Sequence, residues 1–229
     1  MGNVRPHSHR PHMRRVLPAL LLALTPALAH AQARPAPRAD STLRDYAALG
    51  WRNIGPARGG RSVAVAGIPG QSLTWFAGYT GGGLWRTDDA GISWRNISDG
   101  KFTSSSIGAI AVAPSDANVI YVGSGEHAIR GQSSSYGDGV YKSTDQGRTW
   151  SNVGLAATRQ ISAVRVHPSD PDVVYVAAQG DRWKGTSERG IYRSRDGGTT
   201  WTQLTDFMPT TAMGALLIAP TNPATIYAG

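Results

Sequence analysis

The sequence predicts an all-β protein: a β-propeller of four-stranded antiparallel blades, with about three and a half blades present. Two interleaved sequence repeats support this prediction, because each recurs with a period of about 45–56 residues and no segment shows helical spacing. A β-solenoid is the alternative repeat fold, but its repeats are shorter and parallel. We therefore expect an incomplete ring of antiparallel sheets.

The first repeat predicts a two-stranded hairpin around a proline turn. Upstream of the proline, apolar residues alternate with other residues, as in a half-buried strand. A Pro-Ser/Thr-Asp/Asn turn then leads into a second β-branched run that ends in tyrosine. The copies are residues 107–123, 161–177 and 213–229, with a degenerate copy at 62–78. Each copy is expected to supply the first and second strands of one blade.

The second repeat predicts a third strand, a tight turn and a fourth strand that starts at a tryptophan. Its copies are residues 83–94, 139–150 and 190–201. In such a turn the aspartate can accept bonds from backbone N–H groups, the glycine can adopt positive φ, and the tryptophan ring can pack between adjacent blades. An active site needs its catalytic residue once, so an aspartate that recurs in every blade is predicted to be structural. The predicted structural residues are Asp89, Gly91, Trp94, Asp145, Gly147, Trp150, Asp196, Gly198 and Trp201.

The N-terminal 31 residues predict an export signal. Four arginines precede an apolar run at 16–29, and Ala29-His30-Ala31 fits the small-x-small rule, so cleavage is expected after Ala31. The run has about 14 residues, whereas a spanning helix needs roughly 20, so we expect no membrane anchor here. A buried core helix is the alternative. The expected organisation is a signal peptide at 1–31, a linker at 32–43 and a partial propeller at 44–229, with blades at about 60–98, 106–154, 160–205 and, incomplete, 212–229.

Composition limits the expected cofactors and partners. The net charge of +8 falls by half once the four arginines of residues 1–31 are set aside, so we expect no nucleic-acid partner. The absence of cysteine excludes disulfides, Cys-ligated zinc and cysteine nucleophiles. The sequence also shows no phosphate-binding loop and no zinc motif. We therefore expect no metal and no cofactor.

The pattern Ser/Thr-x-Asp-x-Gly-x-Ser/Thr-Trp resembles the Asp-box, or bacterial neuraminidase repeat, of sialidases, xyloglucanases and the sortilin family. This resemblance covers about residues 44–229 and implies a large propeller that binds a ligand. It extends to bacterial secreted relatives that carry a glycosyl hydrolase label. In xyloglucanases of this type a catalytic aspartate follows the second strand of the first blade, and Thr80 occupies that position here. The Arg-Ile-Pro motif of sialidases has no match, because Ile68-Pro69 lacks the arginine.

Alternating strand direction separates the two faces of the predicted propeller. The proline turns and Asp-boxes share one face, so the variable loops between second and third strands, at 79–82, 124–138 and 178–189, lie on the other. These loops and the segment at 55–61 mix carboxylates, guanidiniums and aromatics, as a sugar or peptide site does. The candidate ligand-binding residues are Arg58, Arg61, Glu126, His127, Arg130, Tyr136, Trp183, Glu188 and Arg189. Glu126 and Asp138 are weak catalytic candidates, and the alternative is that these residues are solvated loop charges.

Two functions remain open from the sequence. The first is a secreted propeller that binds a peptide, protein or glycan ligand on the face opposite the Asp-boxes. The second is a xyloglucanase-like glycoside hydrolase acting on polysaccharide, with catalytic carboxylates partly outside this sequence. The sequence Trp51–Ile54 resembles the start of a fourth strand, and Gly229 follows a second strand. We therefore expect a fragment of an exported protein, periplasmic or extracellular, whose partners include its own missing C-terminal blades.

Overall fold

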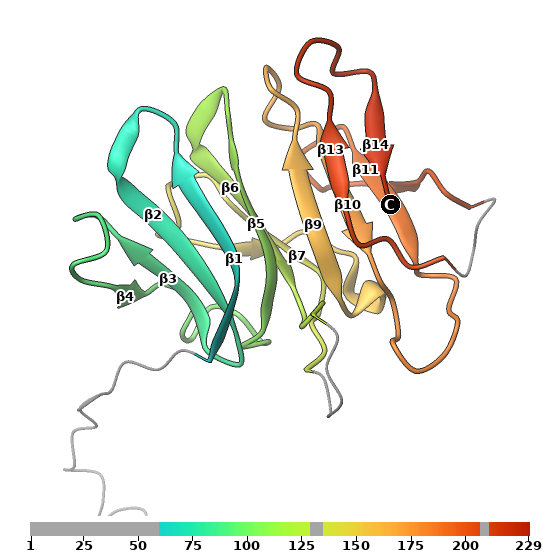
Figure 1. Cartoon of the computed structure of the whole chain (residues 1–229), viewed down its shortest axis with the longest axis horizontal. Helices are drawn as coiled ribbons and strands as arrows, with labels where there is room; N and C mark the ends of the chain where they lie inside the picture. Colours follow the sequence, from blue (N-terminus) through green and yellow to red (C-terminus); the bar gives the residue numbers. More distant parts are fainter. Residues whose placement is uncertain (1–59, 129–134, 207–210) are drawn as a thin grey trace, which may run out of the picture. The chain divides into compact units, whose positions relative to one another are not determined.

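The computed structural model describes residues 60–128, 135–206 and 211–229, which lie within one compact unit, Asn53–Gly229 (Figure 1). Three four-stranded sheets and one two-stranded sheet make up this unit, and every strand pair is antiparallel. The predicted all-β propeller of four-stranded antiparallel blades is confirmed. The predicted signal peptide, the linker and the segment 51–54 lie outside the described residues.

The four sheets, here called blades 1 to 4, follow the chain in order. Blade 1 contains β1 (Arg61–Ile68), β2 (Gln71–Thr80), β3 (Gly83–Thr87) and β4 (Arg95–Asn96). Blade 2 contains β5 (Ile107–Ala113), β6 (Asp116–Ser124), β7 (Val140–Ser143) and β8 (Ser151–Asn152). A short 3₁₀ helix, η1 (Ala156–Thr158), leads to blade 3, which contains β9 (Ile161–Val166), β10 (Val174–Ala178), β11 (Gly190–Ser194) and β12 (Thr202–Gln203). Blade 4 contains β13 (Leu216–Ile218) and β14 (Ile226–Ala228).

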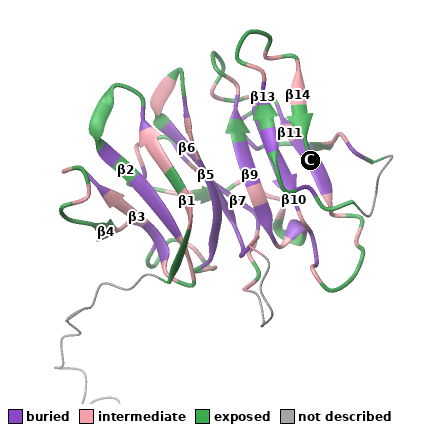
Figure 2. Cartoon of the chain, in the orientation of Figure 1, coloured by how far each residue is buried: buried purple, intermediate pink, exposed green. Residues whose placement is uncertain are grey.

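The first strands of successive blades are neighbours, because β1 contacts β5, β5 contacts β9, and β9 contacts β13. The apolar core lies between the blades and is divided into three clusters, one for each pair of successive blades. Figure 2 shows this arrangement, with buried residues concentrated on the strands that face a neighbouring sheet. Each blade is therefore stabilised mainly by burial against the next blade, as in other repeat folds.

Each Asp-box forms a hydrogen-bonded turn. In blade 2 the Ser143 hydroxyl donates to Asp145 over 2.8 Å and accepts the N–H of Gly147, also over 2.8 Å. Asp145 in turn accepts the N–H of Thr149 over 2.8 Å and its hydroxyl over 2.6 Å. Gly147 has a φ of 83°, in the left-handed region that glycine adopts without steric cost. Asp89 and Asp196 accept equivalent hydrogen bonds in blades 1 and 3. The carboxylates of all three aspartates therefore hold the Asp-box turns together.

Each Asp-box turn also bonds to the first hairpin of its own blade. The N–H of Gln146 donates to the Asn118 carbonyl over 3.0 Å, and the N–H of Gly197 donates to the Asp172 carbonyl over 2.9 Å. Blade 1 has the corresponding bond, from Ala90. The Asp-box turns and the hairpin turns therefore share one face, and the connections between second and third strands lie at the opposite end.

The three Asp-box tryptophans do not share one environment. Trp150 packs edge-to-face on Phe102, which follows blade 1, with 5.2 Å between ring centroids. Trp201 donates from Nε1 to the Val153 carbonyl of blade 2 over 2.7 Å. Trp94, predicted to pack between blades, is instead exposed, because no described sheet precedes blade 1. Trp150 and Trp201 therefore lie between blades as predicted, and the packing of Trp94 stays a prediction.

Candidate functional site

The candidate site lies on the loop face, defined as the end of the blades that carries the connections β2–β3, β6–β7 and β10–β11. The long β6–β7 and β10–β11 connections contact each other, and the β6–β7 connection also contacts the start of β1. Because these segments come from three blades, their side chains are brought together only by the stacking of the blades. The described part of the chain contains no group of three or more His, Cys, Asp or Glu side chains that could hold a metal ion.

Glu126 occupies the base of this site. Its side chain is completely buried and forms an ion pair with the half-exposed guanidinium of Arg61, from the start of β1. The backbone N–H of Ser135 donates to the other carboxylate oxygen over 3.3 Å. A buried carboxylate is stable only when it is paired and hydrogen-bonded. These contacts therefore join blade 1 to the long connection of blade 2.

Two arginines organise the connections through backbone carbonyls. Arg182 donates from Nη2 to the carbonyls of His127 and Ala128 over 3.1 and 3.0 Å, and so links the connections of blades 2 and 3. Arg189 donates from Nη2 to the carbonyls of Asp181 and Lys184, which closes the β10–β11 connection on itself. Their planar, multidentate guanidiniums suit this role. Both side chains therefore contribute to loop shape.

Asp181 is the centre of a second network. It accepts the backbone N–H of Trp183 over 2.9 Å and the guanidinium of Arg159 over 3.1 Å, and the Tyr136 hydroxyl lies 3.4 Å away. The Arg159 guanidinium also stacks over the Tyr136 ring at 4.8 Å. The hydrogen bond from Trp183 and the positive charge of Arg159 lower the pKa of Asp181. Asp181 is therefore ionised at neutral pH and holds the loops together.

Two aromatic side chains of this site remain open to solvent. Trp183 is about two thirds exposed, at 66%, and Tyr136 is also exposed. The backbone of Trp183 is fixed by Asp181, and the ring of Tyr136 is fixed by Arg159. Exposed aromatics held on an ordered polar base provide flat apolar surface for a ligand that also carries hydroxyl groups.

His127 lines a small cavity between the first strands of blades 1 to 3. The cavity has a volume of about 190 Å³ and is also lined by Gly108 of β5 and by Ser162 and Arg165 of β9. Burial lowers the pKa of His127, so the imidazole is neutral at neutral pH. Its buried Nδ1 has no hydrogen-bond partner among the described residues. His127 is therefore directed toward the interior rather than toward the exposed aromatics.

Asp138 belongs to a separate structural network within blade 2. Its carboxylate accepts the hydroxyls of Tyr141, Ser124 and Thr103, the first over 2.5 Å and the second over 3.0 Å. Glu188 lies in the β10–β11 connection, where hydrogen bonds from its own backbone N–H and from the Thr186 and Ser187 hydroxyls lower its pKa. The carboxylate of Asp138 is thus occupied by three hydroxyl groups, and the hydrogen bonds that lower the pKa of Glu188 lie within its own connection.

The structure brings together most of the residues that the sequence suggested for ligand binding. Arg61, Glu126, Tyr136, Trp183 and Arg189 lie in or border the connected loops, and His127 lies beneath them. Arg58 and Arg130 lie outside the described residues. Thr80, at the end of β2, has a buried hydroxyl oxygen without a hydrogen-bond partner among the described residues.

Sequence reasoning missed Arg159, which joins Tyr136 to Asp181. Arg159 immediately precedes the first-strand region of blade 3 and has a positive φ of 57°. The sequence contains a usable signal, because Arg159 lies shortly before the first strand of blade 3 just as Arg58 lies shortly before the first strand of blade 1.

The amino-acid sequence of the chain matches a known protein family. The family model described as Sortilin-Vps10 (sortilin, neurotensin receptor 3) matches residues 81–223. A xyloglucanase from Hypocrea jecorina is 26% identical over 193 residues, covering 77% of this chain and 21% of the relative. A probable oligoxyloglucan-reducing end-specific xyloglucanase from Neosartorya fischeri is 23% identical over 187 residues, covering 78% of this chain and 22% of the relative. The chain thus spans about a fifth of the length of these curated relatives.

Solved structures show the same fold. An ancestral GH74 enzyme superposes with a TM-score of 0.61 at 20% identity, covering 80% of this chain and 23% of that structure. The GH74 xyloglucanase from Xanthomonas campestris superposes with a TM-score of 0.56 at 21% identity, covering 79% and 29% respectively. The suspected relationship to sortilin-like and xyloglucanase-like propellers is confirmed, and the chain belongs to the Sortilin-Vps10 family.

Proposed function

We propose that this chain is part of an exported propeller that binds a polysaccharide on its loop face, without hydrolysis by the carboxylates described here. The observation that carries the proposal is that each of these carboxylates is already paired or hydrogen-bonded to other groups of the protein. Glu126 is buried against Arg61, three hydroxyls surround Asp138, and Asp181 is bonded to Trp183 and Arg159. Their contacts support a structural role in shaping the binding surface.

The electrostatics also favour binding over acid catalysis. A glycoside hydrolase needs a general acid whose pKa is raised, so that the carboxyl still carries a proton near neutral pH. The pKa values of Asp181 and Glu188 are instead lowered. Thr80 stands where the xyloglucanase resemblance places a catalytic aspartate. A threonine hydroxyl cannot perform that proton transfer at neutral pH.

The exposed aromatics support a glycan as the ligand. Trp183 and Tyr136 can stack on sugar rings, while the neighbouring loop carbonyls and guanidiniums can bond to sugar hydroxyls. The xyloglucanase relatives make xyloglucan the first polysaccharide to test. Export is proposed from the signal-like sequence of residues 1–31. The described chain has no helix with the length and apolarity needed to span a bilayer.

Native affinity electrophoresis of the full chain in gels containing xyloglucan tests this function. We expect the mobility of the wild-type chain to decrease with xyloglucan concentration, and Trp183→Ala to weaken the apparent affinity about 10-fold. Trp75→Ala removes an exposed tryptophan of β2 away from the loop face and should leave the affinity unchanged. Unretarded wild-type protein, or equal retardation of Trp183→Ala, would contradict the proposal.

The relatives favour glycoside hydrolysis as a second candidate function. In that case the carboxyl groups that act as acid and base come from outside the described residues, because a pair of accessible carboxyls is required across the scissile bond. The loop face would then supply the substrate-binding part of a larger site. Both candidates predict that this chain binds xyloglucan, and hydrolysis by a protein that also carries those further carboxyl groups would identify the second candidate.

A further inference from the structure

The charged groups around the β10–β11 connection are unequally exposed. Asp181 is buried, and each of its two carboxylate oxygens accepts a hydrogen bond. Lys184 is exposed, and the side chain of Arg159 is 42% exposed. Both cations contribute positive charge that lowers the pKa of Asp181, which places them beside the same carboxylate. The exposed charge next to this carboxylate is therefore positive.

The net charge of this region is positive as well. Its cationic side chains are Arg159, Arg182, Lys184 and Arg189, and its carboxylates are Asp181 and Glu188. The region therefore has a net charge of +2. Glu126, in the neighbouring β6–β7 connection, is neutralised by its ion pair with Arg61. A surface of this charge favours an anionic ligand over a neutral one.

The guanidinium of Arg159 has hydrogen-bond donors to spare. Among the described residues it donates only to Asp181, from Nη1 over 3.1 Å. Its Cζ atom lies over the Tyr136 ring, 4.8 Å from the centroid. The Nε and Nη2 atoms, which form one edge of the guanidinium, are thus left for a ligand. Two parallel N–H donors on one edge match the two oxygens of a carboxylate.

The backbone of Arg159 is held in an unusual conformation. Its φ is 57°, in the left-handed region that residues other than glycine seldom adopt. The Arg159 carbonyl accepts the N–H of Gly137, next to Tyr136, over 2.5 Å. The β6–β7 connection therefore fixes both the backbone and the side chain of Arg159. Strained backbone that the surrounding structure enforces is concentrated at ligand sites.

Two exposed aromatic rings lie beside these cations. The Tyr136 ring contacts the Arg159 guanidinium, and Trp183 directly precedes Lys184 in the chain. Sugar rings can stack on either aromatic face, with a cation close to the substituents of the sugar. We call Tyr136, Arg159, Trp183 and Lys184 the blade 2–3 site.

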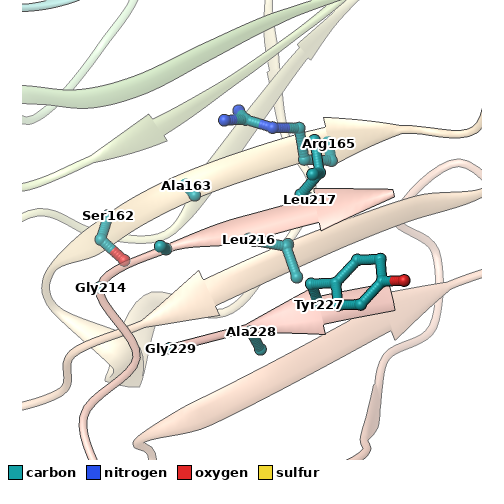
Figure 3. Close-up of a pocket in the computed structure, with 10 residues that line it drawn as sticks. Ser162, Ala163, Arg165, Gly214, Leu216, Leu217, Tyr227, Ala228 and Gly229 are labelled. Carbon is teal, nitrogen blue, oxygen red and sulfur yellow. The ribbon is translucent and has the colours of Figure 1, made fainter. Parts of the chain in front are cut away.

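The blade 2–3 site is bounded by complete blades. Each of its residues lies in a connection within or between blades 2 and 3, whose strands are all described. The hollow of about 320 Å³ at β13 and β14 is different, because Leu217 and Tyr227 line it on the last described sheet (Figure 3). Exposure at the blade 2–3 site therefore does not depend on what packs beyond blade 1 or blade 4.

We propose that the blade 2–3 site selects an acidic polysaccharide, one whose sugar rings carry carboxylates, as uronic acids do. This inference rests on the proposed function and names the class of polysaccharide. A uronate ring would stack on Tyr136 or Trp183, and its carboxylate would accept hydrogen bonds from Nε and Nη2 of Arg159. The Lys184 ammonium would bind the carboxylate of a neighbouring sugar. A neutral polysaccharide would use the aromatic rings but not the two cations.

Isothermal titration calorimetry of the full chain tests the proposal with two oligosaccharides that differ only in charge. The probes are hexagalacturonate and its full methyl ester, which has no carboxylate. At about 50 mM NaCl we expect hexagalacturonate to bind about 10-fold more tightly than the ester, the gain from charge-assisted hydrogen bonds. This preference should fall below about 3-fold at about 500 mM NaCl, because salt screens the exposed cations.

Variants of the two cations identify the site. Arg159→Gln and Lys184→Gln should each lower the preference for hexagalacturonate over the ester by about 3-fold or more. Lys184 is exposed and its ammonium has no polar contact with another described residue, so Lys184→Gln tests the site even if Arg159→Gln disturbs the loops. Arg195→Gln is the matched control, because this exposed arginine lies in the Asp-box turn of blade 3, on the opposite face. It should keep the wild-type preference.

Three results would overturn the proposal. The first is equal affinity for hexagalacturonate and the ester, and the second is an unchanged preference in both Arg159→Gln and Lys184→Gln. The third is equally tight binding of polyaspartate, which carries carboxylates without sugar rings. A xyloglucan oligosaccharide separates this proposal from the proposed function. If it binds as tightly as hexagalacturonate, polysaccharide binding stands and only the acidic class fails, whereas no binding of any saccharide contradicts both.

Discussion

The guanidinium of Arg61, at the start of β1, forms an ion pair with the completely buried carboxylate of Glu126, in the connection after β6. The two residues belong to different blades and are far apart in sequence. Their pairing joins blade 1 to the β6–β7 connection at the base of the loop face. It therefore links the proposed binding surface to the packing of blades 1 and 2.

Removal of the two partners should have unequal effects on stability. Arg61→Ala removes a positively charged partner from a completely buried carboxylate and is expected to lower the free energy of unfolding by about 2 kcal/mol. Glu126→Gln leaves a half-exposed guanidinium that water can solvate, so we expect a loss below about 1 kcal/mol. Urea denaturation followed by tryptophan fluorescence measures both values. Equal losses would mean that burial of Glu126 does not control the energetics of the pair.

The Asp-boxes should make the stability of the folded protein depend on pH in the acidic range. Hydrogen bonds from the Ser93 and Thr200 hydroxyls lower the pKa of Asp89 and Asp196 from 3.8 to about 2. Because the folded-state pKa lies below the unfolded-state value, the stabilisation is complete above about pH 4 and is lost as the pH falls toward 2. We expect the melting temperature of the wild type to fall across this interval.

The matched variant for this prediction is Asp196→Asn. Its neutral amide does not titrate, so its melting temperature should be lower near pH 6 but fall less between pH 4 and pH 2 than that of the wild type. Asp99→Asn, at an exposed aspartate before β5, should follow the wild-type curve. Parallel curves for the wild type and Asp196→Asn would show that the Asp-box carboxylate does not contribute to the acid transition.

Gly123 should resist substitution because blade 3 approaches its backbone closely. A Cβ atom at Gly123 would lie 2.3 Å from Cγ2 and 2.8 Å from Cβ of Ile161, at the start of β9. Gly123→Ala is therefore expected to cost about 1–3 kcal/mol through overpacking. Gly214→Ala is the control, because its added Cβ would meet only the Gly229 carbonyl oxygen, at an ordinary 3.6 Å. Urea denaturation of the two variants should show a loss only for Gly123→Ala.

The proposed function predicts that the two weak catalytic candidates do not hydrolyse xyloglucan. We expect no release of reducing ends above background from the wild-type chain, and no change in Glu126→Gln or Asp138→Asn. A xyloglucanase serves as the positive control in the same assay. Hydrolysis by the wild type that either substitution abolishes would establish a catalytic carboxylate and refute pure binding.

The fold was predictable because its determinants repeat. The Asp-box turn requires an aspartate, a glycine and a hydroxyl residue at fixed local spacing, and all three copies form the same hydrogen bonds. The positions of the apolar runs before and after each proline turn also predicted which strands pair. The environment of Trp94 was not predictable in this way, because its burial depends on whether another sheet precedes blade 1.

The candidate site was less predictable because its contacts do not repeat. Glu126 and Trp183 both lie in connections between a second and a third strand, and this correctly indicated that they share the loop face. It could not indicate that Glu126 is buried against Arg61, or that Thr103, far earlier in the chain, bonds to Asp138. These contacts depend on how long connections of different blades meet. Local sequence patterns do not encode that geometry.

The hydrogen bond from Gln146 to Asn118 has a consequence for how such a propeller can diversify. It fastens the Asp-box turn to the hairpin of the same blade, so each blade is closed at one end by its own residues. The connection at the other end is then not needed to close its own blade, and it spans residues 81–82, 125–139 and 179–189 in the three complete blades. Selection can lengthen or replace these connections one blade at a time, so new recognition surfaces can be grafted without redesigning the scaffold.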